Sequence, residues 1–135
     1  MINFKNKIVF IVGGSGLVGK KIISKLNKLG CKKIHNFDLK KYKFNNSKRL
    51  INHKIDITNI ENFNSFLKKK VNKKQLCPDI FINCSYPHSK DWIRNNFKSV
   101  DYENYEKNIN LHLNSYIWLT KLIIKKMKIF KKKGS

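Results

Sequence analysis

The sequence has 135 residues, 41% of them hydrophobic, which is enough for a single domain with a hydrophobic core. No stretch approaches the roughly 20 apolar residues that a membrane-spanning helix needs, so we expect no membrane partner, and no signal peptide is predicted. Cys31, Cys77 and Cys84 are widely spaced and form no Cys-x-x-Cys pair, which argues against a disulfide framework or a metal site and favours a cytoplasmic location.

The formal net charge of +22 comes from 30 basic and 8 acidic residues, and every basic residue except Arg49 and Arg94 is a lysine. Short lysine runs such as Lys68–Lys70 and Lys131–Lys133 are compatible with nucleic-acid binding. They are also typical of a solvated surface whose lysines follow a compositional bias. Because few aromatic or arginine side chains lie among the runs to contact bases, we favour the solvated surface and expect no specific nucleic-acid partner.

The first thirty residues combine a buried strand, a glycine-rich turn and a helix. Ile8–Val12 is a continuous apolar run of mostly β-branched side chains, typical of a strand buried on both faces in a parallel sheet. Gly13, Gly16 and Gly19 follow directly, and Gly30 stands where helices often end. Between them, apolar residues recur at helical spacing: Ile22, Ile23, Leu26 and Leu29.

This order of strand, turn and helix predicts the phosphate-binding turn of a dinucleotide-binding fold. Gly13 allows a tight turn, Gly16 allows backbone N–H groups to approach a pyrophosphate, and Gly19 allows the helix to pack closely on the strand. The first amides of the helix offer unpaired donors and partial positive charge to phosphate groups. In the alternative hypothesis the glycines serve packing alone.

Asp38 follows Gly19 by nineteen residues, at the end of a second predicted strand, Lys32–Leu39. A carboxylate at this point accepts hydrogen bonds from the adenosine ribose and repels the 2′-phosphate of NADP, so we expect NAD as the cofactor. Lys40 and Lys41 reduce that preference. The alternative is an ordinary solvated carboxylate at the end of a strand.

The middle of the chain predicts two further strands with a helix between them. Lys40–Asn52 is polar and predicts a loop, with a short helix as the alternative, and His53–Ile57 predicts a short third strand. Thr58 and Glu61 predict a capping box that begins a helix, and Asp79–Cys84 predicts an apolar fourth strand. The apolar face of that helix consists of Ile60, Phe63, Phe66, Leu67 and Val71.

A long polar connection, Ser85–Ser99, follows the fourth strand at the end where open α/β sheets bind ligands. Asp101 is a good N-cap for a helix that extends to about Phe130. Other polar candidates are weaker. Three residues of this connection are candidates for substrate contact, with ordinary solvation as the alternative: His88, Asp91 and Arg94. His35 and His53 are predicted to be structural or solvated.

Four strands that alternate with helices predict right-handed βαβ units and one parallel sheet in the order 3-2-1-4. The fold class is α/β, a Rossmann-like three-layer α/β/α arrangement over residues 1–135 that stops after about four strands. The apolar edge strand and the last helix, which is apolar around much of its circumference, need further partners. The apolar residues of that helix are Tyr105, Ile109, Leu113, Tyr116, Ile117, Trp118, Ile123, Ile124 and Met127.

These features resemble the short-chain dehydrogenase/reductase family, with the whole chain corresponding to the family's N-terminal half. Gly13–Gly19 is similar to the family's glycine motif, with the spacing commoner in its extended, sugar-nucleotide-modifying branch. Asp56 and Ile57 resemble the Asp-Val pair that contacts the adenine ring. Ile82–Tyr86 takes the place of the Asn-Asn-Ala-Gly motif, keeps its Asn83, and favours the compact branch.

The resemblance implies an NAD(P)-dependent oxidoreductase that acts on a small-molecule, sugar-derived substrate. The complete protein is expected to form a homo-oligomer through the long helix. The cofactor-binding residues that follow from the motif and the resemblance are Gly13, Ser15, Gly16, Leu17, Val18, Gly19, Asp38, Leu39, Asp56, Ile57, Asn83, Cys84 and Ser85.

The combination of INCSYP with LHLNSY at Leu111–Tyr116 resembles one subgroup, oxidoreductases associated with flagellin modification and bacterial surface-polysaccharide synthesis. In that subgroup the position of His112 replaces the helix asparagine of the wider family's catalytic set. We therefore place His112 beside the active site as a catalytic residue that holds a water in a proton relay, since neutral imidazole both donates and accepts. The alternative is a partly buried histidine bonded to a backbone carbonyl.

The family's catalytic serine and Tyr-x-x-x-Lys pair have no counterpart here. The late tyrosines, Tyr102, Tyr105 and Tyr116, are followed four residues on by Glu106, Ile109 and Thr120. We therefore expect the cofactor-binding part of an oxidoreductase, inactive alone. A non-catalytic nucleotide-binding module is the alternative, and a basic nucleic-acid-binding protein is a more distant one.

Overall fold

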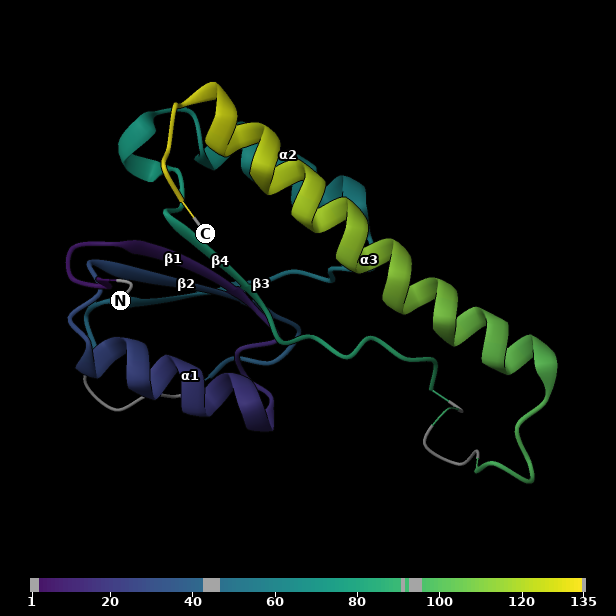
Figure 1. Cartoon of the computed structure of the whole chain (residues 1–135). Helices are drawn as coiled ribbons and strands as arrows, with labels where there is room; N and C mark the ends of the chain where they lie inside the picture. The colour runs from purple at the N-terminus through teal and green to yellow at the C-terminus, as the bar shows by residue number, and fades with distance from the viewer. Residues whose placement is uncertain (1–2, 43–46, 91, 93–95, 135) are drawn as a thin grey trace.

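The computed structural model describes residues 3–42, 47–90, 92 and 96–134, which form a four-stranded parallel sheet between two helical layers. Helix α1 covers one face of the sheet, and α2 and α3 lie side by side on the other (Figure 1). The elements are β1 (Ile8–Val12), α1 (Leu17–Lys28), β2 (Lys33–Asp38), β3 (Leu50–Lys54), α2 (Ile60–Lys70), the short 3-10 helix η1 (Lys74–Leu76), β4 (Ile80–Asn83) and α3 (Tyr102–Ile129). The three-layer α/β fold and the strand order β3-β2-β1-β4 confirm the sequence prediction.

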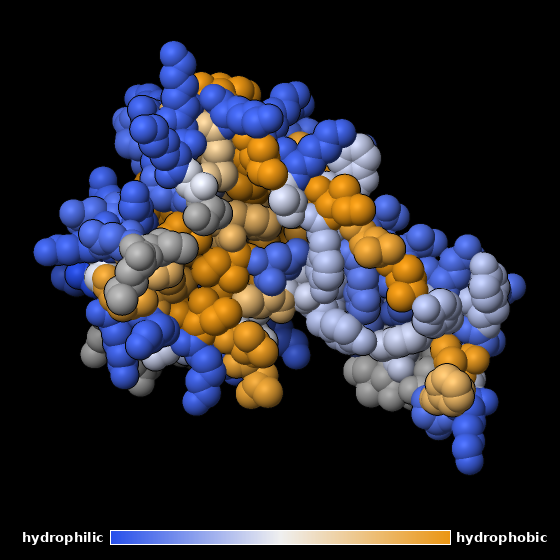
Figure 2. Space-filling model, in the orientation of Figure 1, coloured by the Kyte–Doolittle hydropathy of each residue, from blue (hydrophilic) through white to orange (hydrophobic). Residues whose placement is uncertain are grey.

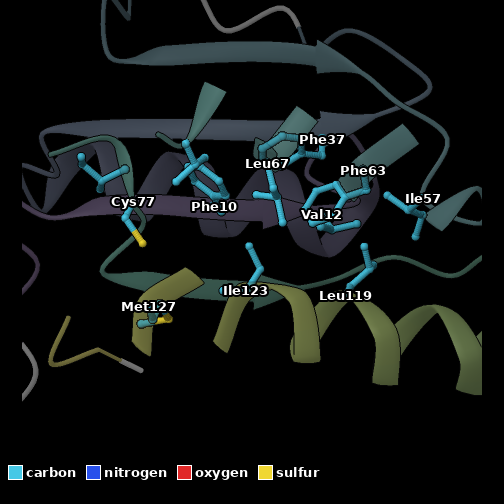
Figure 3. Close-up of a cluster of buried hydrophobic side chains, with 12 residues drawn as sticks. Phe10, Val12, Phe37, Ile57, Phe63, Leu67, Cys77, Leu119, Ile123 and Met127 are labelled. Atoms are coloured by element: carbon cyan, nitrogen blue, oxygen red, sulfur yellow. The ribbon is translucent and has the colours of Figure 1, made fainter. Parts of the chain in front are cut away.

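Strand β1 lies at the centre of the core, as its continuous apolar run predicted. All five of its residues are buried, and it pairs with β2 on one side and β4 on the other. Phe10 and Val12 face α2 and α3, where they meet Phe63 and Ile123 (Figure 3). Val9 and Ile11 point the opposite way into the cluster under α1. The central strand therefore packs against both helical layers, and this packing fixes the position of the glycine turn that follows β1.

The third strand lies earlier in the chain than predicted. The sequence predicted His53–Ile57, but β3 runs over Leu50–Lys54, with Leu50 opposite Ile34 and Lys54 opposite Asp38. β2 ends at Asp38, which lies opposite Lys54, so the paired ladder ends there and β3 ends with it. The apolar residues after Lys54 belong to a turn that leads to α2.

The predicted capping box at the start of α2 is also wrong. Asn59 is the N-cap, and its side-chain oxygen accepts a hydrogen bond from the Asn62 N–H at 3.1 Å. The Thr58 hydroxyl instead donates to Asp56 at 2.7 Å. By contrast, Asp101 caps α3 as predicted and accepts from the Asn104 N–H at 2.8 Å.

Helix α3 extends past the sheet (Figure 1). Much of its apolar surface is uncovered. Leu119, Ile123 and Met127 are buried against the sheet and α2. Apolar side chains also form a line on the outer surface of the helix in Figure 2. The exposed ones are Tyr102, Tyr105, Ile109, Leu113, Ile117, Trp118, Ile124 and Ile129. Within the described residues, no helix is both long enough and apolar enough to cross a membrane.

Candidate functional site

A cleft of about 670 Å³ opens at the carboxyl ends of the parallel strands, where α/β sheets bind ligands. Four chain segments that follow β1, β2, β3 and β4 form its walls. The lining residues are Val12, Gly13, Ser15–Val18, Phe37–Lys40, Ile55–Thr58, Cys84–His88 and Leu111. Among the predicted site residues, Gly19, Asn83 and His112 do not line this cleft.

The glycines of the motif are needed for different structural reasons. Gly13 has φ +73°, and a Cβ there would lie 2.6 Å from the Ser85 Cα. Gly19 is buried, and a Cβ there would lie 2.5 Å from the Gly14 Cα. Gly16 is exposed, and the nearest atom to a Cβ there would be the Gly13 carbonyl oxygen at 3.3 Å. The fold therefore requires glycine at 13 and 19, whereas glycine at 16 leaves the backbone open to the cleft.

The N-terminus of α1 offers unpaired amide donors to the cleft. Gly16 is the N-cap and supplies no side-chain cap, and the first turn contains no acidic residue. Within the described part of the chain, the N–H groups of Leu17, Val18 and Gly19 have no hydrogen-bond acceptor. Three such donors at the positive end of a helix form a binding site for an anion such as a phosphate. This arrangement fits the diphosphate of a dinucleotide.

Asp38 points toward the glycine turn from the end of β2. One carboxylate oxygen accepts the Ser15 N–H at 2.9 Å, and the other accepts the Lys40 N–H at 2.9 Å. A carboxylate oxygen has more than one acceptor position, so both oxygens can still accept a hydroxyl. Asp38, the residue predicted to bind the ribose, therefore lies next to the turn predicted to bind the phosphates.

The segment after β3 forms an apolar wall with a polar rim. Ile57 is buried in the core, and Ile55 and Leu39 line the cleft beside it. The Asp56 carboxylate accepts both the Thr58 N–H at 2.9 Å and its hydroxyl at 2.7 Å. Asp56 and Ile57, for which the family resemblance implies adenine contact, thus line the cleft, and the Asp56 carboxylate is held by a local turn.

The segment after β4 is shaped by Asn83. Its side-chain oxygen accepts the Ser85 N–H at 3.0 Å and the Ser85 hydroxyl at 2.6 Å, so Asn83 holds the turn from behind while Ser85 and Cys84 face the cleft. The Cys84 N–H donates to the Val12 carbonyl at 2.8 Å. Burial raises the pKa of the Cys84 thiol, so this side chain is a neutral wall of the cleft at pH 7.

His112 lies in α3, and its ring neighbours are two tyrosines. Its ring centroid is 4.6 Å from that of Tyr86 and 6.1 Å from that of Tyr116, whose hydroxyl donates to the Ser85 carbonyl at 2.7 Å. Its Nε2 is buried and has no hydrogen-bond partner among the described residues. A bond from this atom to a backbone carbonyl, the alternative considered above, is therefore not found there.

The remaining candidates are spread around the cleft. His88 lies at its lip, and its Nδ1 is 2.9 Å from the Ser89 carbonyl oxygen. Asp91 and Arg94 lie outside the described residues. His35 and His53 lie in β2 and β3, away from the cleft, with their ring nitrogens 2.8 Å apart and the rings parallel. Burial, followed by the neighbouring His53, lowers the pKa of His35 to about 4.

Asn36 is a polar residue next to the site that was not among the predicted site residues. It is fully buried in β2, and its side-chain N–H₂ donates to the Ser15 hydroxyl at 3.1 Å. A polar residue inside an otherwise apolar strand was the available signal, because a buried amide needs hydrogen-bond partners.

Comparison with known proteins agrees with this geometry. Residues 9–113 match the model of the NAD dependent epimerase/dehydratase family. The post-translational flagellin modification protein A of Campylobacter coli is 31% identical over 138 residues, which cover 96% of this chain and 52% of that protein. The chain thus spans about half the length of this curated relative.

Two solved structures have the same fold. A short chain dehydrogenase from Leptospira borgpetersenii with bound NAD+ matches with a TM-score of 0.82 and 24% identity, over 98% of this chain and 50% of that one. A short chain dehydrogenase from Burkholderia cenocepacia in complex with NADP matches with a TM-score of 0.71 and 15% identity, over 96% of this chain and 52% of that one. The chain belongs to the NAD dependent epimerase/dehydratase family, with the Rossmann-like fold of short-chain dehydrogenases.

Proposed function

We propose that the chain is the cofactor-binding part of an NAD-dependent oxidoreductase of the short-chain dehydrogenase/reductase type. The observation that supports this most strongly is the juxtaposition of the unpaired Leu17 and Val18 amides, which line the cleft, with the Asp38 carboxylate; the Gly19 amide, also unpaired, follows them in the first turn of α1. A diphosphate bound to the amides would place the adjoining ribose beside Asp38.

The other lining residues fit the rest of a dinucleotide. Leu39 and Ile57 offer apolar surface for the adenine, and Asp56 lies at the rim of that surface. Cys84 and Ser85 lie at the opposite wall, next to the turn after β1, where the nicotinamide ribose would lie. When bound, the cofactor supplies hydride transfer at its nicotinamide ring. We favour NAD over NADP because the Asp38 carboxylate would repel a 2′-phosphate.

His112 is proposed to hold a water molecule in a proton relay near the reacting centre. Its Nε2 is buried without a partner in the described structure, and a buried nitrogen of this kind ordinarily binds a protein group or an ordered water. Tyr86 lines the cleft and its ring centroid is 4.6 Å from that of His112, so the relay would run beside the Tyr86 ring.

The substrate is proposed to be a small sugar-derived molecule, because the glycine spacing of Gly13–Gly19 resembles the sugar-nucleotide-modifying branch of the family; the Campylobacter coli relative is named for flagellin modification. We place the protein in the cytoplasm and the complete protein in a homo-oligomer, for which the exposed apolar surface of α3 is available. Since none of Tyr102, Tyr105 and Tyr116 has a lysine four residues on, we expect no turnover from this chain alone.

Calorimetric titration of the chain with NAD, NADP and ADP-ribose tests the proposal. We expect NAD and ADP-ribose to bind, and NADP to bind at least about tenfold more weakly, a difference of about 1.4 kcal/mol. The variant Asp38→Asn removes the charge and should narrow the difference between NAD and NADP. Failure of the wild-type chain to bind any of the three would contradict the proposal.

A non-catalytic nucleotide-binding module is the second candidate, favoured by the same absence of a Tyr-x-x-x-Lys pair in the sequence. The coding sequence downstream of Ser135 separates the two. A fifth strand with serine followed by Tyr-x-x-x-Lys supports the enzyme, and a stop codon supports the module.

A further inference from the structure

Asn36 is a fully buried polar residue at the junction of the glycine turn, β2 and β3. Its side-chain N–H₂ donates one hydrogen bond to the Ser15 hydroxyl at 3.1 Å and a second to the Asn52 side-chain oxygen at 2.9 Å. Burying an amide is unfavourable unless it forms hydrogen bonds. Both N–H₂ hydrogens of Asn36 are used, and the two bonds connect β2 with the glycine turn and with β3.

Ser15 connects this amide to the ribose side of the cleft. The Ser15 hydroxyl accepts from Asn36 and donates to the Lys40 carbonyl at 2.6 Å, while the Ser15 N–H donates to Asp38 at 2.9 Å. Asn52 fixes the same segment further along, because its N–H₂ donates to the Tyr42 carbonyl at 3.0 Å. The turn that faces the diphosphate and the segment after β2 that faces the ribose are therefore held in one hydrogen-bonded network.

The same side chain explains a glycine that the dinucleotide motif does not need. Gly14 has no Cβ, and one built there would overlap the Asn36 side-chain oxygen and would lie 2.7 Å from a methyl carbon of Ile23. That oxygen is buried and has no hydrogen-bond partner within the described residues. The turn is packed directly against the Asn36 amide, so a change in this amide would be transmitted to the backbone of the turn.

We propose that Asn36 is a positioning residue for dinucleotide binding, which acts through Ser15 to set the glycine turn and the Asp38–Tyr42 segment in register before the ligand arrives. The inference rests on the proposed function and goes beyond it, because Asn36 does not line the cleft. Holding two halves of a site in the bound geometry improves affinity by lowering the cost of ordering them on binding.

Calorimetry with ADP-ribose on wild type, Asn36→Ala, Ser15→Ala and the double variant tests the coupling. The loss of one hydrogen bond in such a network corresponds to about a tenfold change in affinity. We expect each single variant to bind about tenfold more weakly, and the double variant to lose no more than about tenfold in total, because residues in one network are not additive. A double variant weakened about a hundredfold, or single variants that bind like wild type, would overturn the inference.

Asn59→Ala is the matched control, since it also removes an asparagine hydrogen bond but at the N-cap of α2, outside the network. It should lower the melting temperature without changing the affinity for ADP-ribose. Equal affinity losses in Asn59→Ala and Asn36→Ala would assign the effect to stability and overturn the positioning role. Should Asn36→Ala fold too poorly to be measured, Asn52→Ala removes its other partner at an exposed position, and an unchanged affinity there overturns the inference.

Hydrogen exchange in the ligand-free protein gives a second readout that needs no nucleotide. In Asn36→Ala we expect faster amide exchange at Ser15 and Lys40, whose N–H groups bind Asp38, with unchanged exchange in β1. Unchanged exchange at Ser15 and Lys40 in this variant would overturn the inference about Asn36 but leave the proposed function standing. Failure of the wild-type chain to bind ADP-ribose instead overturns the proposed function, and this inference with it.

Discussion

Two glycines of the Gly13–Gly19 motif should respond differently to an added methyl group, one by losing stability and the other by losing affinity. Gly19→Ala would place a Cβ against backbone, overlapping the Gly13 carbonyl oxygen and 2.5 Å from the Gly14 Cα. Backbone atoms cannot move aside as a flexible side chain can, so overpacking costs about 3 kcal/mol, the upper part of its usual range. Alanine regains about 1 kcal/mol of helix propensity, because position 19 lies within α1. The net loss is about 2 kcal/mol, or roughly 8 °C in melting temperature for a domain of this size.

Gly16→Ala is the matched variant. Its φ of −75° suits alanine, and the nearest atom to the new Cβ would be 3.3 Å away. Replacing glycine by alanine at an N-cap costs less than about 1 kcal/mol, so the fold should persist. The methyl group would, however, stand where a diphosphate approaches the Leu17 and Val18 amides, and affinity for ADP-ribose should fall at least about tenfold.

Thermal unfolding followed by circular dichroism, with calorimetric titration of ADP-ribose, measures both effects. We predict that Gly19→Ala loses stability and that Gly16→Ala loses binding while remaining folded. A Gly16→Ala variant that binds like wild type, or a Gly19→Ala variant as stable as wild type, would refute these predictions.

Three further predictions concern stability and charge. Because burial lowers the pKa of His35 to about 4 while an unfolded imidazole titrates near 6.5, the unfolded state takes up the proton first. The free energy of unfolding should therefore fall by up to about 3 kcal/mol as the pH is lowered from 6.5 to 4. Urea unfolding at a series of pH values measures this; a wild-type free energy that does not change with pH, or a pH dependence that is the same in His35→Phe, would contradict it. Lys132→Ala leaves Asp79 without its 2.8 Å ion pair, at a site where both side chains are less than one-sixth exposed, and should cost about 1–3 kcal/mol in urea unfolding, whereas Lys133→Ala, at an exposed position, should cost nothing measurable. DNA binding, measured by fluorescence anisotropy, should be weak, independent of sequence and lost at modest salt, since the net charge of +22 is spread over lysines; sequence-selective binding that survives salt would show a specific nucleic-acid partner.

The sequence predicted the parts of the fold that depend on neighbours in the chain. Ile8–Val12 is apolar throughout, the glycines follow it, and α1 begins at Leu17, so β1, the turn and the first helix are each specified locally. Asp101 was identified as an N-cap for the same reason, because capping involves a residue and the amides just after it.

The errors arose where a contact distant in sequence decides the outcome. The position of β3 depends on pairing with β2, which no local pattern of HKIDI contains. The Thr58 hydroxyl donates to Asp56 and does not cap α2, because the turn after β3 brings Thr58 and Asp56 together. Asn36 was overlooked because its partners, Ser15 and Asn52, lie 21 and 16 residues away in the sequence.

The central claim is that main-chain amides at the start of α1 receive a diphosphate while Asp38 receives the adjoining ribose. Titration of the ¹⁵N-labelled chain with ADP-ribose, followed by NMR, tests it residue by residue. We predict the largest amide shifts at Leu17, Val18 and Gly19, with a second group at Asp38 and Lys40. Saturable shifts confined to other surfaces, or none at these five amides, would contradict it.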